Sequence, residues 1–330
     1  MPHTTPPSAP MRVFLLGGTG TIGLATKRAL LAQGHSVVSF ERPGVRTVPP
    51  VEHPSLTLRL GDVQNPESLR CDGWRSERFD AVVSCLASRT GLPDDAWAID
   101  HAAHLNVLRS CEAAGVKRFV LLSAMCVQKP RLAFQYAKLA FEQALIESGL
   151  DYSIVRPTAF FKSLSGQVER VRQGRPFVVL GDGTLTACKP ISDADLADFM
   201  VTCLRRDDRV RRILPIGGPG PAITPRRQAE LLAELLDRPV RLRQVPVAVL
   251  RGIVTSLSLL GRVSSSLARK AELARIGLYY ATESMLVIDP QSGLNDALAT
   301  PEWGSDTLKA HYQRLLANEV QADLREHSVF

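Results

Sequence analysis

Residues 13–23 read V-F-L-L-G-G-T-G-T-I-G, an apolar run that breaks into glycines and then enters a helix-like segment at 24–33. A strand, a glycine turn and a helix in this order form the usual site for the pyrophosphate of a dinucleotide, because free N–H groups at the helix start face the phosphates. Glycines at 17, 20 and 23 permit the tight turn, the approach of the phosphates, and close packing of helix on strand. We therefore predict a dinucleotide-binding turn made of Gly17, Gly18, Thr19, Gly20, Thr21, Ile22 and Gly23.

Short apolar runs alternate with helix-like stretches after this turn. Alternation of this kind is typical of a parallel sheet whose two faces are covered by helices. Right-handed crossovers then place the ligand crevice at the carboxyl ends of the strands. The predicted fold is α/β, a Rossmann-type doubly wound parallel sheet with a smaller C-terminal substrate lobe. Further strands are expected at residues 36–40, 56–60, 81–86, 118–123 and 151–155, with helices at 102–114 and 137–148.

The alternation of strand-like and helix-like segments becomes less regular after residue 156, which suggests a different organisation of the second half of the chain. The first ten residues are rich in Pro, Thr and Ser and lack the apolar stretch of a secretory signal. Further along, Thr224 and Pro225 resemble a helix start, with the helix expected at 226–236. We divide the chain into a disordered tail at 1–10, an NADP-binding core at 11–156, and a lobe at 157–330. This lobe is expected to be mostly substrate-binding, with segments that return to the core.

Composition narrows the class of protein. The chain has 330 residues, of which 45% are hydrophobic, so it can bury a large core. The net charge of +7 would suit an anionic partner, but the basic residues are spread out and no nucleic-acid-binding motif occurs, so we expect no nucleic acid. The six cysteines form no C-x-x-C pair, which favours buried free thiols in the cytoplasm. We predict no metal of the protein's own and leave the oligomeric state open.

The residues after the second predicted strand decide between NAD and NADP in folds of this kind. An acid there binds the ribose 2′-hydroxyl of NAD, whereas a base accepts the 2′-phosphate of NADP. The chain offers both, because Glu41 is followed by Arg42, and Arg46 lies nearby. An arginine binds phosphate through two parallel hydrogen bonds, which a ribose hydroxyl does not require. We therefore favour NADPH, with Arg42 at the 2′-phosphate; a surface Glu–Arg pair is the alternative.

The G-x-x-G-x-x-G spacing at 17–23 resembles that of the short-chain dehydrogenase/reductase superfamily, and later segments fit the same comparison. Asp62 falls where that superfamily places an acid near the adenine. The fourth predicted strand is followed by small residues, which let the middle of a cofactor lie against the backbone. Asn106 lies in a helix similar to one that bears an asparagine in these proteins. The segment after the fourth strand supplies Cys85, Leu86 and Ala87 as cofactor contacts.

Most members of that superfamily use a serine followed by Tyr-x-x-x-Lys, in which a nearby ammonium group lowers the pKa of the phenol. Ser123 ends the fifth predicted strand in the expected place, and Lys138 has the spacing of the lysine. The tyrosine position holds Phe134, and Tyr136 would point to a different side of the helix. The usual alcohol chemistry is therefore in doubt, although Lys138 is still expected to hold the nicotinamide ribose. The proton donor is left among Tyr136, Lys162, a substrate group and water.

Three later stretches resemble one family. They read R-P-T-A-F-F-K-S-L at 156–164, G-D-G-T-L-T-A-C-K-P-I-S-D at 181–193 and Y-Y-A-T-E-S-M-L at 279–286. Together with the glycine turn they are similar to the 3,8-divinyl chlorophyllide 8-vinyl reductases of chlorophyll and bacteriochlorophyll synthesis, which are atypical NADPH-dependent short-chain reductases. The resemblance runs from about residue 11 to the C-terminal region. It places Pro157 and Thr158, as well as Ser123 and Lys138, among the cofactor contacts.

The resemblance implies that NADPH reduces an 8-vinyl group to ethyl on a divinyl chlorophyllide-type tetrapyrrole, whose magnesium belongs to the substrate. Such a conjugate reduction needs no phenol to protonate a carbonyl oxygen, so a phenylalanine in the tyrosine position fits it. Two other readings stay open: an isoflavone-reductase-like enzyme acting on a small phenolic substrate, and a non-catalytic NmrA-like NADP sensor. The substrate contacts implied by the similar stretches are Phe160, Phe161, Lys189, Tyr279 and Tyr280.

Residues 245–260 are the most apolar part of the second half, and they include Arg251. The segment is too short to span a bilayer. It is expected to be either a buried helix or pocket wall, or a surface helix that touches a membrane. Flanking basic residues would suit anionic headgroups in the second case. We therefore predict a cytoplasmic protein and leave open peripheral contact with a photosynthetic membrane. The flanking residues are Arg241, Arg243, Arg262, Arg269 and Lys270.

Overall fold

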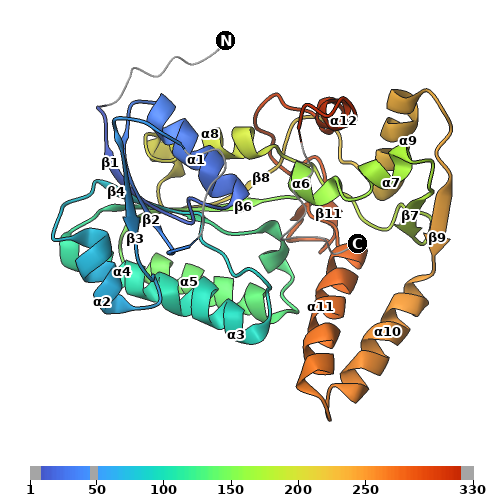
Figure 1. Cartoon of the computed structure of the whole chain (residues 1–330), viewed down its shortest axis with the longest axis horizontal. Helices are drawn as coiled ribbons and strands as arrows, with labels where there is room; N and C mark the ends of the chain where they lie inside the picture. Colours follow the sequence, from blue (N-terminus) through green and yellow to red (C-terminus); the bar gives the residue numbers. More distant parts are fainter. Residues whose placement is uncertain (1–8, 45–50, 321–330) are drawn as a thin grey trace.

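A seven-stranded parallel sheet forms the centre of the computed structural model, which describes residues 9–44 and 51–320 (Figure 1). The strand order is β3-β2-β1-β4-β5-β6-β8, and every neighbouring pair is parallel. The order reverses between β1 and β4, so the crevice for a ligand lies at the carboxyl ends of these two strands. The predicted fold class is confirmed. The strands are β1 (Arg12–Leu16), β2 (Ser36–Glu41), β3 (Leu56–Leu60), β4 (Ala81–Ser84), β5 (Arg118–Leu122), β6 (Asp151–Pro157) and β8 (Arg212–Ile216).

Helices cover both faces of this sheet (Figure 1). Helices α1 (Thr21–Ala32) and α8 (Asp193–Thr202) pack together on one face, and α4 (His104–Ala114) and α5 (Ala133–Glu147) lie on the other. Strand β1 shows why both faces are apolar: Val13 and Leu15 belong to one core cluster, whereas Phe14 and Leu16 belong to the other. Side chains alternate along a strand, so a continuous apolar run is what a sheet covered on both sides requires.

Several element boundaries differ from those predicted, and three of the differences bear on the site. Strand β4 ends at Ser84 rather than at residue 86, because the chain leaves the sheet there. Helix α5 begins at Ala133, four residues before the predicted start, where the Gln135 side chain caps its first turn by accepting from the backbone N–H of Leu132. The helical region predicted at 102–114 is longer in the structure, because α3 (Pro93–Ala96) and the π-helical segment η2 (Trp97–Ala103) lead directly into α4.

Shorter elements complete the first half of the chain. Helix α2 (Pro66–Ser68) and segment η1 (Leu69–Trp74) follow β3, and η3 (Met125–Gln128) follows β5. In α2 the Asn65 side chain accepts hydrogen bonds from the backbone N–H groups of the first turn. The indole of Trp74 stacks on the ring of Phe14, at 4.8 Å between centroids, and belongs to the same core cluster as Phe14 and Leu16.

The C-terminal half contributes both to the main sheet and to a small separate core. Strand β8 and helix α8 return to the Rossmann core, with η4 (Asp207–Arg209) between them. The predicted cap is confirmed, because the Thr224 side chain accepts a hydrogen bond from the Arg227 N–H at the start of α9. A third apolar cluster, the small separate core, is built from these elements: α6 (Phe161–Leu164), α7 (Val168–Arg172), β7 (Phe177–Leu180), α9 (Pro225–Leu236), β9 (Leu242–Val245) and α12 (Leu308–Leu316). Strands β10 (Val287–Ile288) and β11 (Asn295–Asp296) form a short hairpin.

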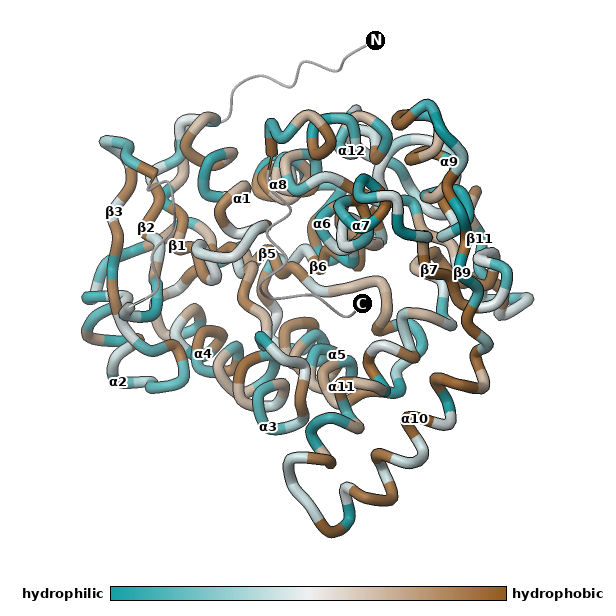
Figure 2. The backbone as a smooth tube through the Cα atoms, turned by 45° about the vertical axis from the view of Figure 1, so that its right-hand side comes forward, coloured by the Kyte–Doolittle hydropathy of each residue, from teal (hydrophilic) through white to brown (hydrophobic). Residues whose placement is uncertain are grey.

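A helical hairpin extends away from the body of the molecule (Figure 1). It consists of α10 (Val247–Leu260) and α11 (Ser265–Thr282), which pack against each other. None of the residues of α10, all of which the structure describes, is buried. The expectation of a buried helix at 245–260 is therefore wrong: the segment is hydrophobic yet exposed (Figure 2). Within the described ranges, no helix combines the length and apolar character needed to cross a bilayer.

All six cysteines are free thiols, as predicted. Four of them are buried, Cys85 is half-buried and Cys71 is exposed. Burial raises the pKa of Cys188 to about 12, so this thiol stays protonated and behaves as a small apolar side chain. The part of the predicted tail at 1–8 lies outside the described residues.

Candidate functional site

The glycine turn between β1 and α1 brings three stretches of backbone into direct contact. Gly17 has φ of +72°, and a Cβ there would overlap the backbone of Cys85 at the end of β4. A Cβ on Gly23 would overlap the Gly17 carbonyl oxygen, so the first turn of α1 packs directly on the turn. These two glycines therefore serve the close packing that the sequence predicted.

Gly20 differs from its neighbours because nothing inside the protein requires a glycine there. A Cβ on Gly20 would make only ordinary contact, at 3.6 Å from the Gly17 carbonyl oxygen. Gly20 is also the N-cap of α1, and no side chain caps this 12-residue helix. The open backbone and the uncapped N–H groups fit a bound pyrophosphate, which would take the place of a cap.

A lysine from the other half of the chain reaches the same turn. The Nζ of Lys162, in α6, donates a hydrogen bond of 3.0 Å to the Oγ1 of Thr21, the first residue of α1. Sequence reasoning placed Lys162 among the candidate proton donors, and the structure places its ammonium group beside the glycine turn. A cation beside uncapped helical N–H groups adds charge to the same anion site.

The end of β2, where the cofactor ribose is expected, carries one buried ion pair and one exposed arginine. The Glu41 carboxylate accepts hydrogen bonds from the Lys27 ammonium at 2.6 Å and from the Ser39 hydroxyl at 2.7 Å. The side chains of Lys27 and Glu41 are only 1% and 5% exposed, so this carboxylate is already neutralised inside the protein. Arg42 is exposed. Arg46 lies outside the described residues.

The remaining predicted cofactor residues line the carboxyl edge of the sheet. Cys85, Leu86 and Ala87 follow β4, and the Cys85 backbone closes over the glycine turn. Asp62 is exposed after β3, and its side chain accepts a hydrogen bond from the Gln64 N–H. Asn106 is a structural residue here, because its amide donates to the Gln64 carbonyl at 3.2 Å and ties α4 to the loop after β3.

Pro157 and Thr158 lie where β6 ends. Both are buried, and the Thr158 hydroxyl donates to the Lys189 carbonyl. The Thr158 N–H donates to the Ile216 carbonyl at 2.9 Å, so the polar groups of this residue are used within the protein. Their place at the crevice edge agrees with the expectation, whereas any contact with a cofactor would come from their apolar atoms.

Lys138 lies in α5 and faces a buried aspartate that sequence reasoning missed. Its Nζ is 2.9 Å from Oδ1 of Asp100, whose side chain is fully buried. The Ser88 N–H donates to the same oxygen at 3.3 Å. The second oxygen, Oδ2, is buried without a hydrogen-bond partner among the described residues. An unsatisfied buried acceptor beside a lysine suits the hydroxyls of a nicotinamide ribose. Asp100 lies in no recognisable motif, so only its position in space identifies it.

Two predicted catalytic residues are turned away from Lys138. The Ser123 hydroxyl donates to Glu142, a buried carboxylate that pairs with Arg156. The Tyr136 ring is 49% exposed, and its hydroxyl donates to the Pro130 carbonyl at 3.1 Å. The structure therefore gives Ser123 a place in a buried polar network and Tyr136 a place on the surface.

Phe134, in the usual tyrosine position, is buried in an apolar cluster with residues of α11. A Cβ on Gly91 would lie 3.2 Å from the Ile276 side chain and 3.4 Å from Phe134, so these three residues pack tightly together. This contact brings α11 against α5 close to Lys138.

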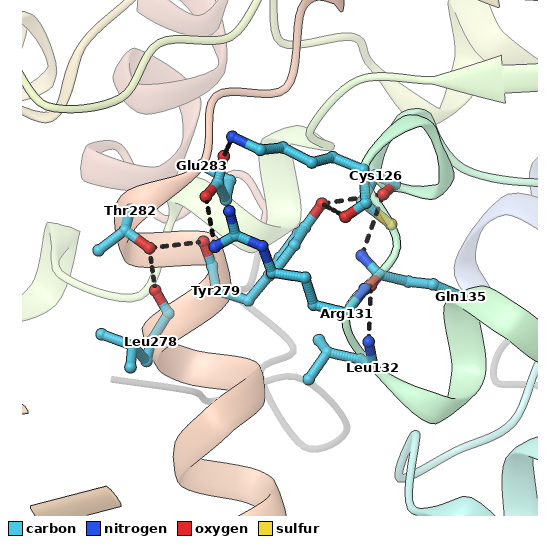
Figure 3. A network of polar contacts seen from close by, with 9 residues as sticks. Cys126, Arg131, Leu132, Gln135, Leu278, Tyr279, Thr282 and Glu283 are labelled. Carbon is cyan, nitrogen blue, oxygen red and sulfur yellow. Dashed lines mark hydrogen bonds and ion pairs between the residues drawn. The ribbon is translucent and has the colours of Figure 1, made fainter. Parts of the chain in front are cut away.

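The two tyrosines of the third similar stretch both reach the segment after β5. Figure 3 shows the contacts of Tyr279. The Tyr279 hydroxyl lies 2.9 Å from the Cys126 carbonyl and 3.0 Å from that of Lys129, and burial raises its pKa to about 12. The hydroxyl of Tyr280 is 3.7 Å from the Cys126 Sγ. Glu283 fixes the end of α11 by pairing with Lys129 at 2.7 Å and with Arg131 at 2.8 Å (Figure 3).

Of three residues expected at the substrate, Phe161 and Lys189 lie inside the protein instead, and Phe160 is half-buried. Phe161 is 4% exposed in the small core, with its ring 5.2 Å from that of His311. Phe160 is half-buried and packs against the core cluster that contains Val13 and Leu15. Lys189 is buried, and its ammonium contacts Glu302 at 2.5 Å and the Thr300 carbonyl at 3.2 Å. Lys189 therefore holds the C-terminal segment on the core rather than facing a ligand.

A cavity of about 850 Å³ lies between the loop before α3 and the first half of α11. Its size is in the range that accommodates organic ligands. Its wall combines apolar and charged side chains, the latter of both signs. The residues include Arg89, Leu92, Pro93, Asp95, Arg269 and Arg275. In the described part of the chain, no group of three or more His, Cys, Asp or Glu side chains has a metal-binding arrangement.

Comparison with known proteins agrees with this geometry. A family described as NAD(P)H-binding matches residues 17–207, which cover the glycine turn and most of the sheet, so the protein binds a nicotinamide dinucleotide. An epimerase from Methanothermobacter thermautotrophicus superposes with a TM-score of 0.69 at 17% identity, over 94% of this chain and 93% of that one, which supports the fold.

Curated relatives extend over nearly the whole chain. The chloroplastic divinyl chlorophyllide a 8-vinyl-reductase of Cucumis sativus is 43% identical over 96% of this chain and 79% of its own length. The enzyme of the same name from Oryza sativa subsp. indica is 44% identical over 96% of this chain and 82% of its own. The chain has a dinucleotide-binding fold, lacks a tyrosine four residues before Lys138, and is similar to both enzymes over nearly its whole length. The chain belongs to the divinyl chlorophyllide a 8-vinyl-reductase family.

Proposed function

We propose that this protein uses NADPH to reduce the 8-vinyl group of divinyl chlorophyllide, or of the corresponding protochlorophyllide, to an ethyl group. The observation that carries the proposal is the 43% and 44% identity with named 8-vinyl reductases over 96% of the chain. The absence of a tyrosine four residues before Lys138 supports it, since reduction of a conjugated carbon–carbon bond requires no proton on a carbonyl oxygen.

The residues at the crevice supply binding and orientation for this reaction, to which NADPH contributes the hydride. Uncapped N–H groups of α1 and the Lys162 ammonium are placed to hold the pyrophosphate. Asp100 and Lys138 are placed to hold the nicotinamide ribose through the free Oδ2 oxygen and the ammonium group.

Preference for NADPH over NADH is part of the proposal and rests on the end of β2. Glu41 is buried and paired with Lys27, so its carboxylate is not available to a ribose hydroxyl. The exposed Arg42 that follows can pair with a 2′-phosphate through two hydrogen bonds. The buried ion pair also removes the negative charge that would repel such a phosphate.

The cavity beside α11 is the site we propose for the tetrapyrrole. The macrocycle is flat and apolar, and it carries a propionate when it is not esterified. Leu92 and Pro93 offer apolar contact, and Arg269 offers a cation for the propionate. Tyr280, one of the expected substrate residues, lies on the same helix beyond Arg275.

The test is turnover with purified components. Mixing the protein with NADPH and divinyl chlorophyllide under anaerobic conditions is expected to shift the Soret band toward that of the monovinyl product. NADPH binding without oxidation on any tetrapyrrole would favour the NmrA-like sensor, and oxidation with small phenolic substrates alone would favour the isoflavone-reductase-like enzyme. Heat-denatured protein is the control for light-driven or chemical change of the pigment.

We further propose that α10 rests on an anionic membrane surface. Its apolar side chains include several that are about half exposed, and Val263, which follows α10 in the same hairpin, is 86% exposed. Exposed basic side chains lie on the same hairpin, a combination that favours anionic headgroups. The apolar residues are Val249, Ile253, Leu259, Leu260 and Val263, and the basic ones are Arg251, Arg262, Arg269 and Lys270.

Flotation with vesicles tests this contact. The protein is expected to float with vesicles that contain anionic lipid and less well with neutral vesicles or at high salt. The double substitution Ile253→Asp with Leu260→Asp should abolish flotation. Leu298→Asp is the matched control, since Leu298 is 96% exposed and lies outside the hairpin. A concentration-dependent dimer that protects the hairpin, with no flotation, would assign the surface to a second copy instead.

A further inference from the structure

The reduction proposed above needs a proton at the inner vinyl carbon, and no residue at the usual position can give it, because that position holds Phe134. We propose that Tyr280, from α11 in the C-terminal half, is the catalytic residue that donates this proton. The inference rests on the proposed function and goes beyond it by naming the donor.

The hydroxyl of Tyr280 lies at the carboxyl end of the sheet. It is 3.7 Å from the Sγ of Cys126, a residue of η3, which follows β5 directly. Tyr280 as a residue is 40% exposed, while its hydroxyl is directed to Cys126. Tyr280 therefore combines a partly accessible side chain with a hydroxyl near the crevice.

The position of Tyr280 is fixed by its neighbours on α11. The adjacent Tyr279 hydroxyl is anchored to the Cys126 carbonyl, and the two rings meet edge to face at 5.6 Å between centroids. One turn earlier, Ile276 packs against Phe134 and the Gly91 backbone. These contacts hold α11 against α5, on the side where Lys138 and Asp100 meet. The proton donor and the nicotinamide-binding pair thus face the same space.

The electrostatic setting suits a donor to carbon. Burial of the hydroxyl, assisted by the negative field of groups that include Asp100, raises the pKa of Tyr280 well above its usual value. The phenol therefore stays protonated at neutral pH. A delocalised carbanion is a much stronger base than a phenolate, so the donor does not need the lowered pKa that an alcohol dehydrogenase gives its tyrosine.

Three other hydroxyls among the described residues are committed elsewhere. Tyr279 is held by two backbone carbonyls, Tyr136 by the Pro130 carbonyl, and Ser123 by the Glu142 carboxylate. The Cys126 thiol is the nearest rival, and burial raises its pKa against the smaller opposing effect of the Lys138 charge. It lies behind the Tyr280 hydroxyl as a buried side chain, so we assign the donor role to the phenol.

The step balances as follows. The vinyl group gains a hydride at its terminal carbon and a proton at its inner carbon, and NADPH is oxidised to NADP⁺. The O–H bond of Tyr280 breaks as the new C–H bond forms, leaving a phenolate. The phenolate oxygen recovers its proton from water after the product has left.

The test compares Tyr280→Phe with Tyr136→Phe and Cys126→Ala. We expect Tyr280→Phe to lower the single-turnover rate by about 100-fold or more, a typical contribution of general acid catalysis. Binding of NADPH, followed by its fluorescence, and of pigment, followed by its absorption, should change less than about threefold, because the ring is kept. Tyr136→Phe and Cys126→Ala should keep their rates within the same factor.

Two further readouts separate a donor from a merely structural residue. The solvent deuterium isotope effect on the wild-type rate should be lost or altered in Tyr280→Phe, and the residual rate should fall as pH rises because water-derived acid replaces the phenol. In the protein without ligands, this variant should also remove one tyrosine that titrates well above its usual pKa. A wild-type protein that never reduces the vinyl group would overturn the proposed function itself. Wild-type turnover with an unaffected Tyr280→Phe, or with the loss confined to Cys126→Ala, would overturn only the role of Tyr280.

Discussion

The ammonium group of Lys162 lies 3.0 Å from the hydroxyl of Thr21, which joins α6 to the first turn of α1. The two residues are 141 positions apart, yet together they flank the uncapped helix end where a pyrophosphate fits. The chain therefore adds a cation from its second half to the helix end that we propose as the phosphate site, which is otherwise made of backbone.

Replacing Lys162 by Gln is expected to weaken NADPH binding by roughly tenfold or more, because a charge-assisted hydrogen bond to phosphate contributes about 1.5–3 kcal/mol. Titration of NADPH fluorescence measures this affinity. Lys309→Gln is the control, since Lys309 pairs with Glu234 between α12 and α9 and is half exposed. Equal affinities for wild type and Lys162→Gln would remove Lys162 from the cofactor site.

Arg42→Ala is expected to weaken NADPH binding far more than NADH binding, because only NADPH carries a 2′-phosphate for the guanidinium group. The measurement is the ratio of the two dissociation constants in wild type and variant. Arg28→Ala, on the same helix–strand unit and exposed, serves as the control. A parallel loss for both nucleotides would show that Arg42 does not set the preference.

The glycines of the turn should separate folding from binding. Gly23→Ala places a Cβ onto the Gly17 carbonyl, so we expect lower thermal stability together with loss of binding. Gly20→Ala meets nothing closer than 3.6 Å and should fold normally while failing to bind NADPH, since the methyl group occupies the pyrophosphate position. Thermal melting and NADPH titration of both variants check this; normal binding by Gly20→Ala would place the phosphates elsewhere.

The buried imidazole of His104 predicts a loss of stability in acid. Burial lowers its pKa to about 4, and its Nδ1–H donates to the Ile99 carbonyl while the Ser84 hydroxyl lies 2.8 Å from Nε2. The unfolded chain binds a proton near pH 6.5 and the folded one only near pH 4, so the contribution of His104 to folding is complete above pH 6.5 and declines below it.

Relative to a His104→Gln variant, the wild type should therefore lose about 2 kcal/mol of unfolding free energy between pH 7 and pH 5. Urea unfolding at the two pH values measures the difference. His53→Gln is the control, since His53 is exposed. Parallel changes in wild type and His104→Gln would show that another group governs the acid response.

The sequence by itself determined the fold and the location of the dinucleotide site. An apolar strand, a glycine turn and a helix are local patterns, and their alternation along the chain leaves one arrangement of layers. The identity of residues 134 and 138, four positions apart on one helix, likewise showed that the usual tyrosine is missing.

Only the tertiary structure decided which side chains surround the site, because the contacts that matter join residues from different parts of the sequence. Lys162 reaches Thr21, Tyr280 reaches Cys126 across 154 residues, and Lys27 neutralises Glu41. The burial of a hydrophobic segment also could not be predicted from its sequence. A segment such as α10 has the same composition whether it is buried or exposed, and only its packing partners in the fold distinguish the two cases. Local patterns specify elements, whereas the orientation of a side chain depends on neighbours that the fold brings together.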